Sequence, residues 1–251
     1  MNKRKVVSIL LILTMIVTLA SFVVYFSIES NRVYGELHKS LVYGAYLDAN
    51  DIARELGSFT YNFYDNIHRL NSSLRRETSV YDETKERIIL GKCELLETYA
   101  ERGWFDISRD LNDLRRLADL DKEIPFFNAS VFETVYNVIR EAFGQVEWAT
   151  RGKGEEILNE TLPFLWELYY LLGVDQVEQY PPAESGLLAL DWCFTELYGY
   201  WYAESKYGKG DILTGKTPPQ TVLEWAVGNA TALHQELIQW DKYHTSLLYP
   251  D

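Results

Sequence analysis

The sequence predicts an all-α protein, with an N-terminal transmembrane helix followed by a bundle of about seven helices outside the cytoplasm. Three observations carry this prediction. Residues 6–26 are apolar and uncharged, apolar residues recur three and four positions apart in most of the remaining chain, and no long segment alternates between apolar and polar residues. We therefore expect a cytoplasmic basic tip at residues 1–5, a signal-anchor helix at 6–26 and one acidic helical domain at 27–251.

The apolar run is long enough to cross a bilayer. A helix needs about 20 apolar residues to span roughly 30 Å of hydrocarbon. The alternative is a signal peptide cleaved after Ala20, but such peptides have an apolar core of only about 7–15 residues, and this run continues to Phe26. It also lacks the polar face of a soluble core helix. We expect an uncleaved anchor in the lipid bilayer.

The basic residues before the run predict its orientation. Lys3, Arg4 and Lys5 precede it directly, and basic residues next to a membrane helix stay on the cytoplasmic side. We expect the N-terminus in the cytoplasm and the domain outside the cell membrane. Because no second apolar run has spanning length, we expect a single-pass protein.

The charge of the expected domain limits its partners. All 37 Asp and Glu residues but only 21 of the 24 Lys and Arg residues follow the apolar run, so the exported part has a net charge of −16. Such a charge repels nucleic acid and anionic surfaces, favours cationic partners and also promotes solubility. We expect no nucleic-acid partner.

The first helix of the domain is expected to continue from the anchor through residues 27–34 and to end near Leu74. A hinge around Ser30 and Asn31 is the alternative, and the polar residues 71–79 are expected to form the turn after the helix. Its core-facing positions recur three and four apart: Ile52, Leu56, Phe59, Phe63, Ile67, Leu70 and Leu74.

Three further helices are expected in the middle of the chain. One covers residues 82–102 and stops at Gly103, because glycine is common after a last helical turn. Asp106 then caps the next, and Ser130 with Glu133 forms a capping box that begins the third.

The C-terminal part predicts three more helices. Pro163 favours a start or a bend near Thr161 in a helix that Gly173 ends. A helix at residues 187–203 is apolar on nearly all sides, so we expect it to be the most buried one. After a loop at residues 206–219, the last helix carries the clearest seam for packing against another helix: Leu223, Ala226, Ala230, Leu233, Leu237, Trp240, His244 and Leu247.

Two pairs of Asp and His are the sharpest chemical signal. Asp65 with His68, and Asp241 with His244, each place a carboxylate and an imidazole one helical turn apart, as in carboxylate-bridged metal bundles. Asp65 and His68 lie opposite the apolar stripe of their helix, however, whereas His244 lies within its seam. We therefore expect no metal and no other cofactor, and interpret His244 as a core histidine with a neighbouring hydrogen-bond partner.

The two cysteines have two interpretations. Cys93 and Cys193 each lie on an apolar helical stripe. They are either separate core thiols or a disulfide that closes a loop of about 100 residues and stabilises the fold.

An aromatic group near the helix expected at 187–203 could stack on a sugar or on a partner protein. The helical spacing favours a core role instead. Its members are Tyr198, Tyr200, Trp201, Tyr202 and Tyr207.

Four sequons agree with an exported domain. An Asn-X-Ser/Thr motif accepts N-linked glycans in some organisms, and helix capping also favours Asn, Ser and Thr at helix ends. The four candidate sites are Asn71, Asn128, Asn159 and Asn229.

No motif in the sequence specifies catalysis. We expect a membrane-anchored, extracytoplasmic binding or interaction module with a protein partner in the membrane or envelope. One alternative is a cell-envelope enzyme, a hydrolase or a metal-dependent one, that uses acidic and His residues in a polar pocket. A second is a sensor input domain that works through a partner membrane protein, since only five residues precede the apolar run.

Overall fold

The structure, a computed structural model, consists of two compact units. We call Met1–Leu41 the N-terminal unit and Val42–Asp251 the bundle unit, and describe each by itself. The residues described are 3–76, 82–120, 129–150, 158–177, 186–207 and 219–248.

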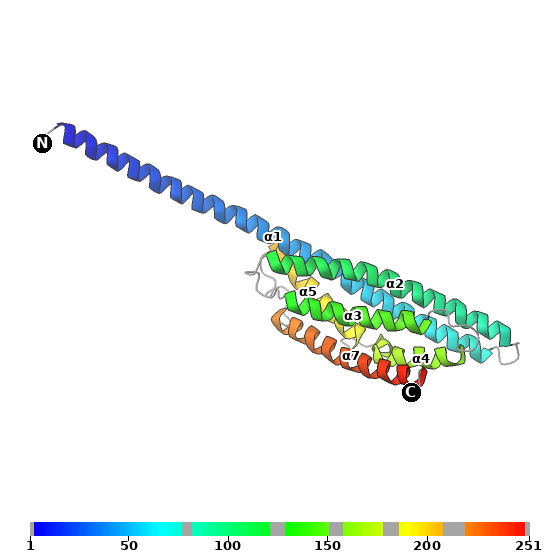
Figure 1. The fold of residues 1–251 in the computed structure, drawn as a ribbon. Coiled ribbons are helices and arrows are strands. Elements are labelled where there is room, and N and C mark those ends of the chain that lie inside the picture. Colours follow the sequence, from blue (N-terminus) through cyan, green and yellow to red (C-terminus); the bar gives the residue numbers. More distant parts are fainter. Residues whose placement is uncertain are drawn as a thin grey trace. The chain divides into compact units, whose positions relative to one another are not determined.

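The described residues form helices and no strand, which confirms the all-α prediction (Figure 1). They hold six α-helices and one short 3₁₀ turn, so the expected count of about seven helices is wrong. In chain order the elements are α1 (Lys3–Arg76), α2 (Asp82–Leu120), α3 (Ala129–Thr150), α4 (Leu158–Leu171), η2 (Val174–Gln176), α5 (Leu187–Tyr207) and α7 (Pro219–Leu248).

The count is lower because Gly103 does not end a helix. α2 runs through Gly103 and Asp106 as one helix of 39 residues. Gly103 is buried where α2 meets α3, and a Cβ added there would lie 2.9 Å from Cε1 of Phe143. The glycine therefore allows close packing between two helices, and Asp106 lies inside α2 instead of capping a new helix.

α1 is also longer than expected. It is helical through Ser30 and Asn31, and it ends at Arg76, so residues 71–76 are helix and not the expected turn. In the bundle unit, its predicted core stripe is buried at Ile52, Leu56, Phe59, Phe63 and Ile67.

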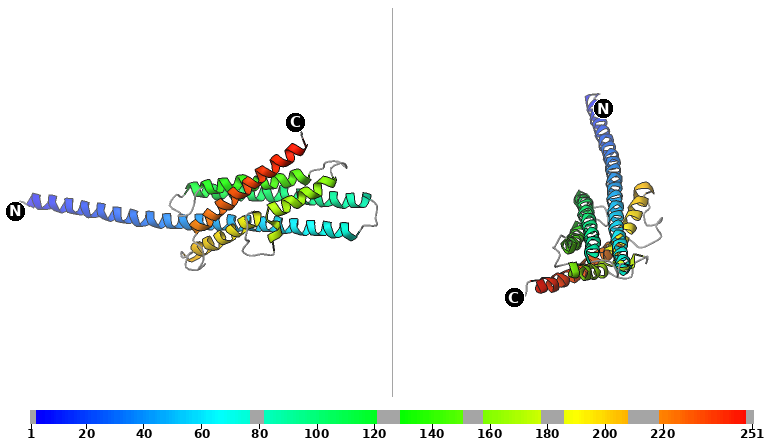
Figure 2. Two further views of the ribbon diagram at one scale, coloured as in Figure 1. Left: turned by 90° about the horizontal axis from the view of Figure 1, so that it is seen from below. Right: turned by 90° about the vertical axis from the view of Figure 1, so that its right-hand side faces the viewer.

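The core of the bundle unit lies between α2, α3 and residues 42–76 of α1, which run side by side (Figure 2). Phe59 of α1 packs on Phe143 of α3 with ring centroids 4.3 Å apart. Lys92 of α2 donates a 2.9 Å hydrogen bond to Oδ1 of Asn66 on α1. α7 packs on both α3 and α5, and its predicted seam is buried from Leu223 to His244.

The C-terminal helices are close to the prediction. α4 begins at Leu158, three residues before Thr161, near which a start or a bend was expected. Pro163 lies inside the helix. It ends before Gly173, whose φ of 69° is the left-handed conformation that favours glycine. α5 is longer than expected and reaches Tyr207, and α7 begins at Pro219, so both ends of the loop expected at 206–219 are helical. Residues 208–218 of that loop lie outside the described residues.

Candidate functional site

The apolar part of α1 is the most distinctive surface of the protein. Among the described residues, α1 is the helix that is long and apolar enough to cross a membrane, and none of its apolar window is buried. Each large apolar side chain from Ile12 to Ile28 is between 55% and 70% exposed. The alternative of a soluble core helix, which would bury these side chains, does not fit this exposure.

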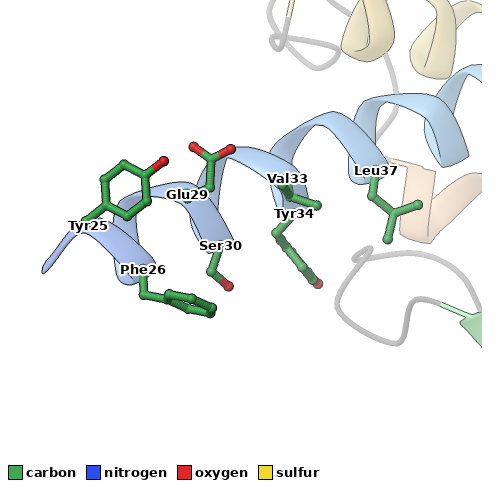
Figure 3. A pocket seen from close by; sticks show the side chains of 7 residues that line it. All are labelled: Tyr25, Phe26, Glu29, Ser30, Val33, Tyr34 and Leu37. Carbon is green, nitrogen blue, oxygen red and sulfur yellow. The ribbon is translucent and has the colours of Figure 1, made fainter. Parts of the chain in front are cut away.

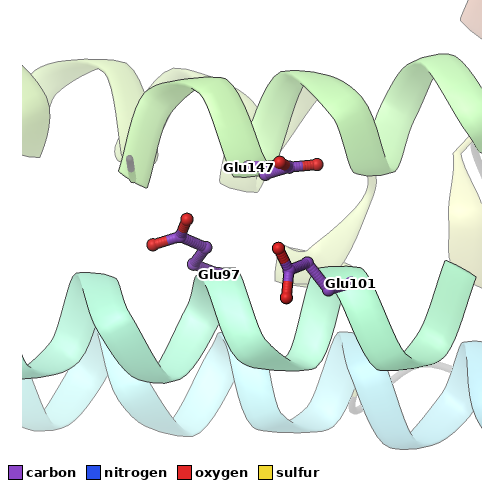
Figure 4. A group of neighbouring side chains, drawn as sticks. All are labelled: Glu97, Glu101 and Glu147. Atoms are coloured by element: carbon purple, nitrogen blue, oxygen red, sulfur yellow. The ribbon is translucent and has the colours of Figure 1, made fainter. Parts of the chain in front are cut away.

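A second feature is a group of three glutamates between α2 and α3. One carboxylate oxygen each from Glu97, Glu101 and Glu147 lies within 4.8 Å of the others. Glu97 and Glu101 are one turn apart on α2 and point toward Glu147 on α3 (Figure 4). Carboxylate oxygens are ligands of Ca²⁺ and Mg²⁺, but an acidic surface also brings carboxylates together, so the group alone does not define a metal site.

Two of the three glutamates, Glu101 and Glu147, line a hollow of about 310 Å³. Its lining also includes Trp104, Phe105 and Arg140. The sequence signal for this group was the spacing of Glu97 and Glu101, and the α3 partner could not be identified without the packing of α2 on α3.

The structure places the two Asp and His pairs in different surroundings. His68 Nε2 lies 3.2 Å from the hydroxyl of Tyr169, and Asp65 forms an ion pair with Arg69. His244 is buried, and its Nε2 lies 2.7 Å from Oε2 of Glu167. This agrees with the interpretation of His244 as a core histidine with a polar neighbour, while Asp241 on the same helix is exposed.

The aromatic group of α5 divides between the core and the surface. Trp201 is buried, whereas Tyr202 is 38% exposed. Tyr46 of α1 packs against both Tyr202 and Tyr198, with ring centroids 5.2 and 6.1 Å away, and Tyr43 lies 5.7 Å from Tyr46. Tyr43, Tyr46, Tyr198 and Tyr202 thus form one partly exposed surface, which we call the tyrosine surface. Tyr200 is half-buried, and the side chain of Tyr207 lies outside the described residues.

Both cysteines are buried free thiols in the structure. Burial raises the pKa of the Cys93 thiol to about 11 and that of Cys193 to about 12. The amide of Asn229 points to Sγ of Cys193 at 3.9 Å. These surroundings are typical of core thiols and not of nucleophiles.

The contact with Cys193 leaves Asn229 half-buried, which disfavours a glycan at that sequon. Asn71 and Asn159 lie within α1 and α4 instead of in loops. Asn128 lies outside the described residues.

Buried carboxylates form a feature that the sequence analysis did not identify. Burial, together with the negative charges of Asp110, Asp113 and Asp51, raises the pKa of Asp48 to about 7. The Asp110 side chain is 5% exposed, and its Oδ2 has no hydrogen-bond partner among the described residues. Its Oδ1 accepts a 2.8 Å hydrogen bond from Arg109. The acids could not be recognised as buried from the sequence, because their positions resemble those of a solvated helix face.

Comparisons with protein-family models, curated proteins and solved structures found no match.

Of the features above, the exposed apolar helix makes the strongest statement about function. The carboxylates and aromatic rings are compatible with several roles, whereas a long helix with an exposed apolar segment favours an apolar environment.

Proposed function

We propose that the protein is a single-pass membrane protein whose bundle unit is a binding module outside the cytoplasm. The observation that carries the proposal is the exposure of every large apolar side chain from Ile12 to Ile28. Moving each such side chain from water into an apolar environment contributes about 1.5–3 kcal/mol. A bilayer provides that environment along the whole segment, and residues 6–26 match its thickness.

The orientation is supported by the distribution of charge. Lys3, Arg4 and Lys5 precede the apolar segment, and the excess of acidic residues follows it. Basic residues favour the cytoplasmic side, so the bundle unit is assigned to the outside.

Protein binding is supported by the tyrosine surface. Tyrosine is enriched at the centre of protein interfaces, where its ring is buried and its hydroxyl forms hydrogen bonds. Tyr43 and Tyr202 remain exposed at 52% and 38%. Together with the net charge of −16, this surface fits a protein partner in the membrane or envelope that carries basic residues.

The topology is tested with a C-terminal epitope tag and external protease. We expect intact cells to lose the tag and the protein to stay in the membrane fraction after a high-salt wash. In a matched variant with Lys3, Arg4 and Lys5 replaced by Glu, part of the tag should become protected. A protected tag in the original protein, or a mature N-terminus directly after Ala20, would overturn the anchored topology.

The binding role is tested by purifying the protein with its partners from membranes. Tyr202→Ala combined with Tyr43→Ala should reduce a co-purifying protein about tenfold or more, as expected for interface tyrosines. Tyr61→Ala is the matched control, because Tyr61 is 61% exposed on the same helix away from the tyrosine surface. If all variants recover the same proteins in the same amounts, the tyrosine surface is not the binding site.

A further inference from the structure

The N-terminal unit continues beyond the apolar segment as an amphipathic helix. At 100° per residue, Phe26, Ser30, Val33 and Leu37 lie within an arc of about 60° on one face of α1. The charged residues lie to one side of this face, with Glu29 and Glu36 next to it and Arg32 and Lys39 farther round the helix. We call the face formed by Phe26, Ser30, Val33 and Leu37 the seam.

The seam is exposed in the structure. Phe26, Val33 and Leu37 are 62%, 54% and 54% exposed. Phe26, Ser30 and Leu37 project from the same side of α1, while Tyr25 and Glu29 project from the other (Figure 3). The helix outside the apolar segment therefore presents an uncovered apolar face.

The charged side of the helix is already balanced within the helix. Arg32 forms ion pairs with Glu29, one turn before it, and with Glu36, one turn after it. Glu29 and Glu36 at the edge of the seam are thus paired within their own helix, and the seam itself carries no charge.

A membrane surface does not fit as the cover of the seam. An interfacial amphipathic helix lies in the plane of the bilayer, whereas this segment continues the same helix as the membrane span without a break. The partner that packs on the seam must therefore run alongside α1, as a second parallel helix does.

We propose that the seam pairs with the seam of a second copy of this chain in a parallel dimer. The seam positions are separated by four, three and four residues, the spacing of the core positions in a left-handed coiled coil. A copy inserted by the same segment has the same direction and depth in the membrane, so its Phe26, Ser30, Val33 and Leu37 lie level with those of the first copy. Such pairing is isologous and closed.

The residues beside the seam also fit a second copy. In a parallel coiled coil, a residue just before a seam position lies opposite the residue five positions later in the partner helix. Glu29 then faces Tyr34 of the second copy, and Glu36 faces Leu41 of the second copy, so no like charges meet. The same seam continues through Ile12, Ile16, Leu19 and Val23, which are exposed at the same spacing.

The inference rests on the proposed membrane anchorage, and disulfide crosslinking in isolated membranes tests it. Seam variants Ser30→Cys and Val33→Cys are compared with Gly35→Cys, which lies opposite the seam and whose added Cβ would meet no atom within 4 Å. After mild oxidation we expect about tenfold more product of twice the chain mass from the seam variants than from Gly35→Cys. The native chain, whose cysteines are buried, is the background control.

The outcomes separate the dimer from other arrangements. Equal crosslinking at all three positions would indicate random collision and overturn the proposal, as would no crosslinking at any of them. A seam-specific product of a different mass would identify another protein as the cover and would also overturn it. Membrane fractionation of each variant is measured in parallel, so that loss of the anchor is distinguished from loss of pairing.

A charge variant provides a second measurement. Val33→Glu places a carboxylate in the seam and should shift the protein from dimer to monomer mass in mild detergent, while Lys39→Glu, on the charged side, should leave the dimer unchanged. Dimers of equal abundance in both variants would contradict pairing through the seam.

Discussion

Gly103 determines how closely α2 approaches α3. Its missing side chain makes room for Phe143, and an added Cβ would lie 2.9 Å from the ring. Gly103→Ala should therefore lower the free energy of unfolding of the bundle unit by about 1–3 kcal/mol through overpacking. Gly91→Ala is the control on the same helix, because its Cβ would meet no atom within 4 Å. That change should be neutral or stabilise by up to about 1 kcal/mol, as measured by urea denaturation.

Asp48 gives the bundle unit a pH dependence. Its pKa in the folded protein is about 7, against about 3.9 in an unfolded chain. The folded state therefore holds the proton that the unfolded state releases, and stability falls as the pH rises from about 4 to about 7. Asp48→Asn should reduce the loss of unfolding free energy between pH 5 and pH 8 by about 1 kcal/mol. This value is smaller than the full pKa shift would give, because Asp48 is only half-buried and solvent screens its charge.

The comparison is made by urea denaturation at several pH values. Asp191, whose pKa is also raised to about 7 by burial, remains in the Asp48→Asn variant and leaves part of the slope. A slope equal to that of the original protein would show that Asp48 does not carry a raised pKa.

These two residues show what could and could not be predicted from the sequence at this scale. Helical spacing identified core residues such as Phe63 and Leu237, because burial of an apolar side chain follows from the period of the helix. The roles of Gly103 and Asp48 depend on what a second helix places against them. Neither Phe143 nor Asp110 is a neighbour in sequence, so the pattern around Gly103 was interpreted as a helix end.

At the scale of elements, Glu167 connects α4 to α7. Its Oε2 accepts a 3.1 Å hydrogen bond from Nε1 of Trp240 and lies 2.7 Å from Nε2 of His244. Glu167→Ala removes one acceptor from two neighbouring groups of α7, and should lower the free energy of unfolding by about 1–3 kcal/mol. Asp241→Ala, an exposed acid on α7, should change it by less than about 0.5 kcal/mol.

Thermal unfolding followed by circular dichroism measures both variants. A similar loss from Asp241→Ala would indicate that the Asp241 and His244 pair has a role of its own, as in the metal-site alternative. The apolar stripe of α7 predicted that this helix packs against another helix. It did not predict which one, because such a stripe contains no signal for the helix that covers it.

At the scale of the whole molecule, the two units differ in the polarity of their surfaces. The N-terminal unit exposes its apolar residues, whereas the bundle unit buries its own and carries the acidic excess at its surface. The sequence predicts an apolar anchor and an acidic domain from their composition. It places their boundary after residue 26, whereas the bundle unit begins at Val42. The arrangement of the helices within the bundle unit depends on close contacts such as that of Gly103 with Phe143, which composition does not encode.

The division predicts that the bundle unit folds without the N-terminal unit. A chain beginning at Val42 retains the buried face of α1 from Val42 to Ile67 and every helix that packs on it. About 210 residues are enough for an independent core, so this chain should be soluble without detergent, helical by circular dichroism and cooperative in thermal unfolding. The complementary deletion, which keeps residues 1–76 alone, should remain in membranes and expose the core stripe to aggregation. If the chain beginning at Val42 is insoluble or unfolds without a cooperative transition, the N-terminal unit contributes to the fold of the bundle and not only to its anchorage.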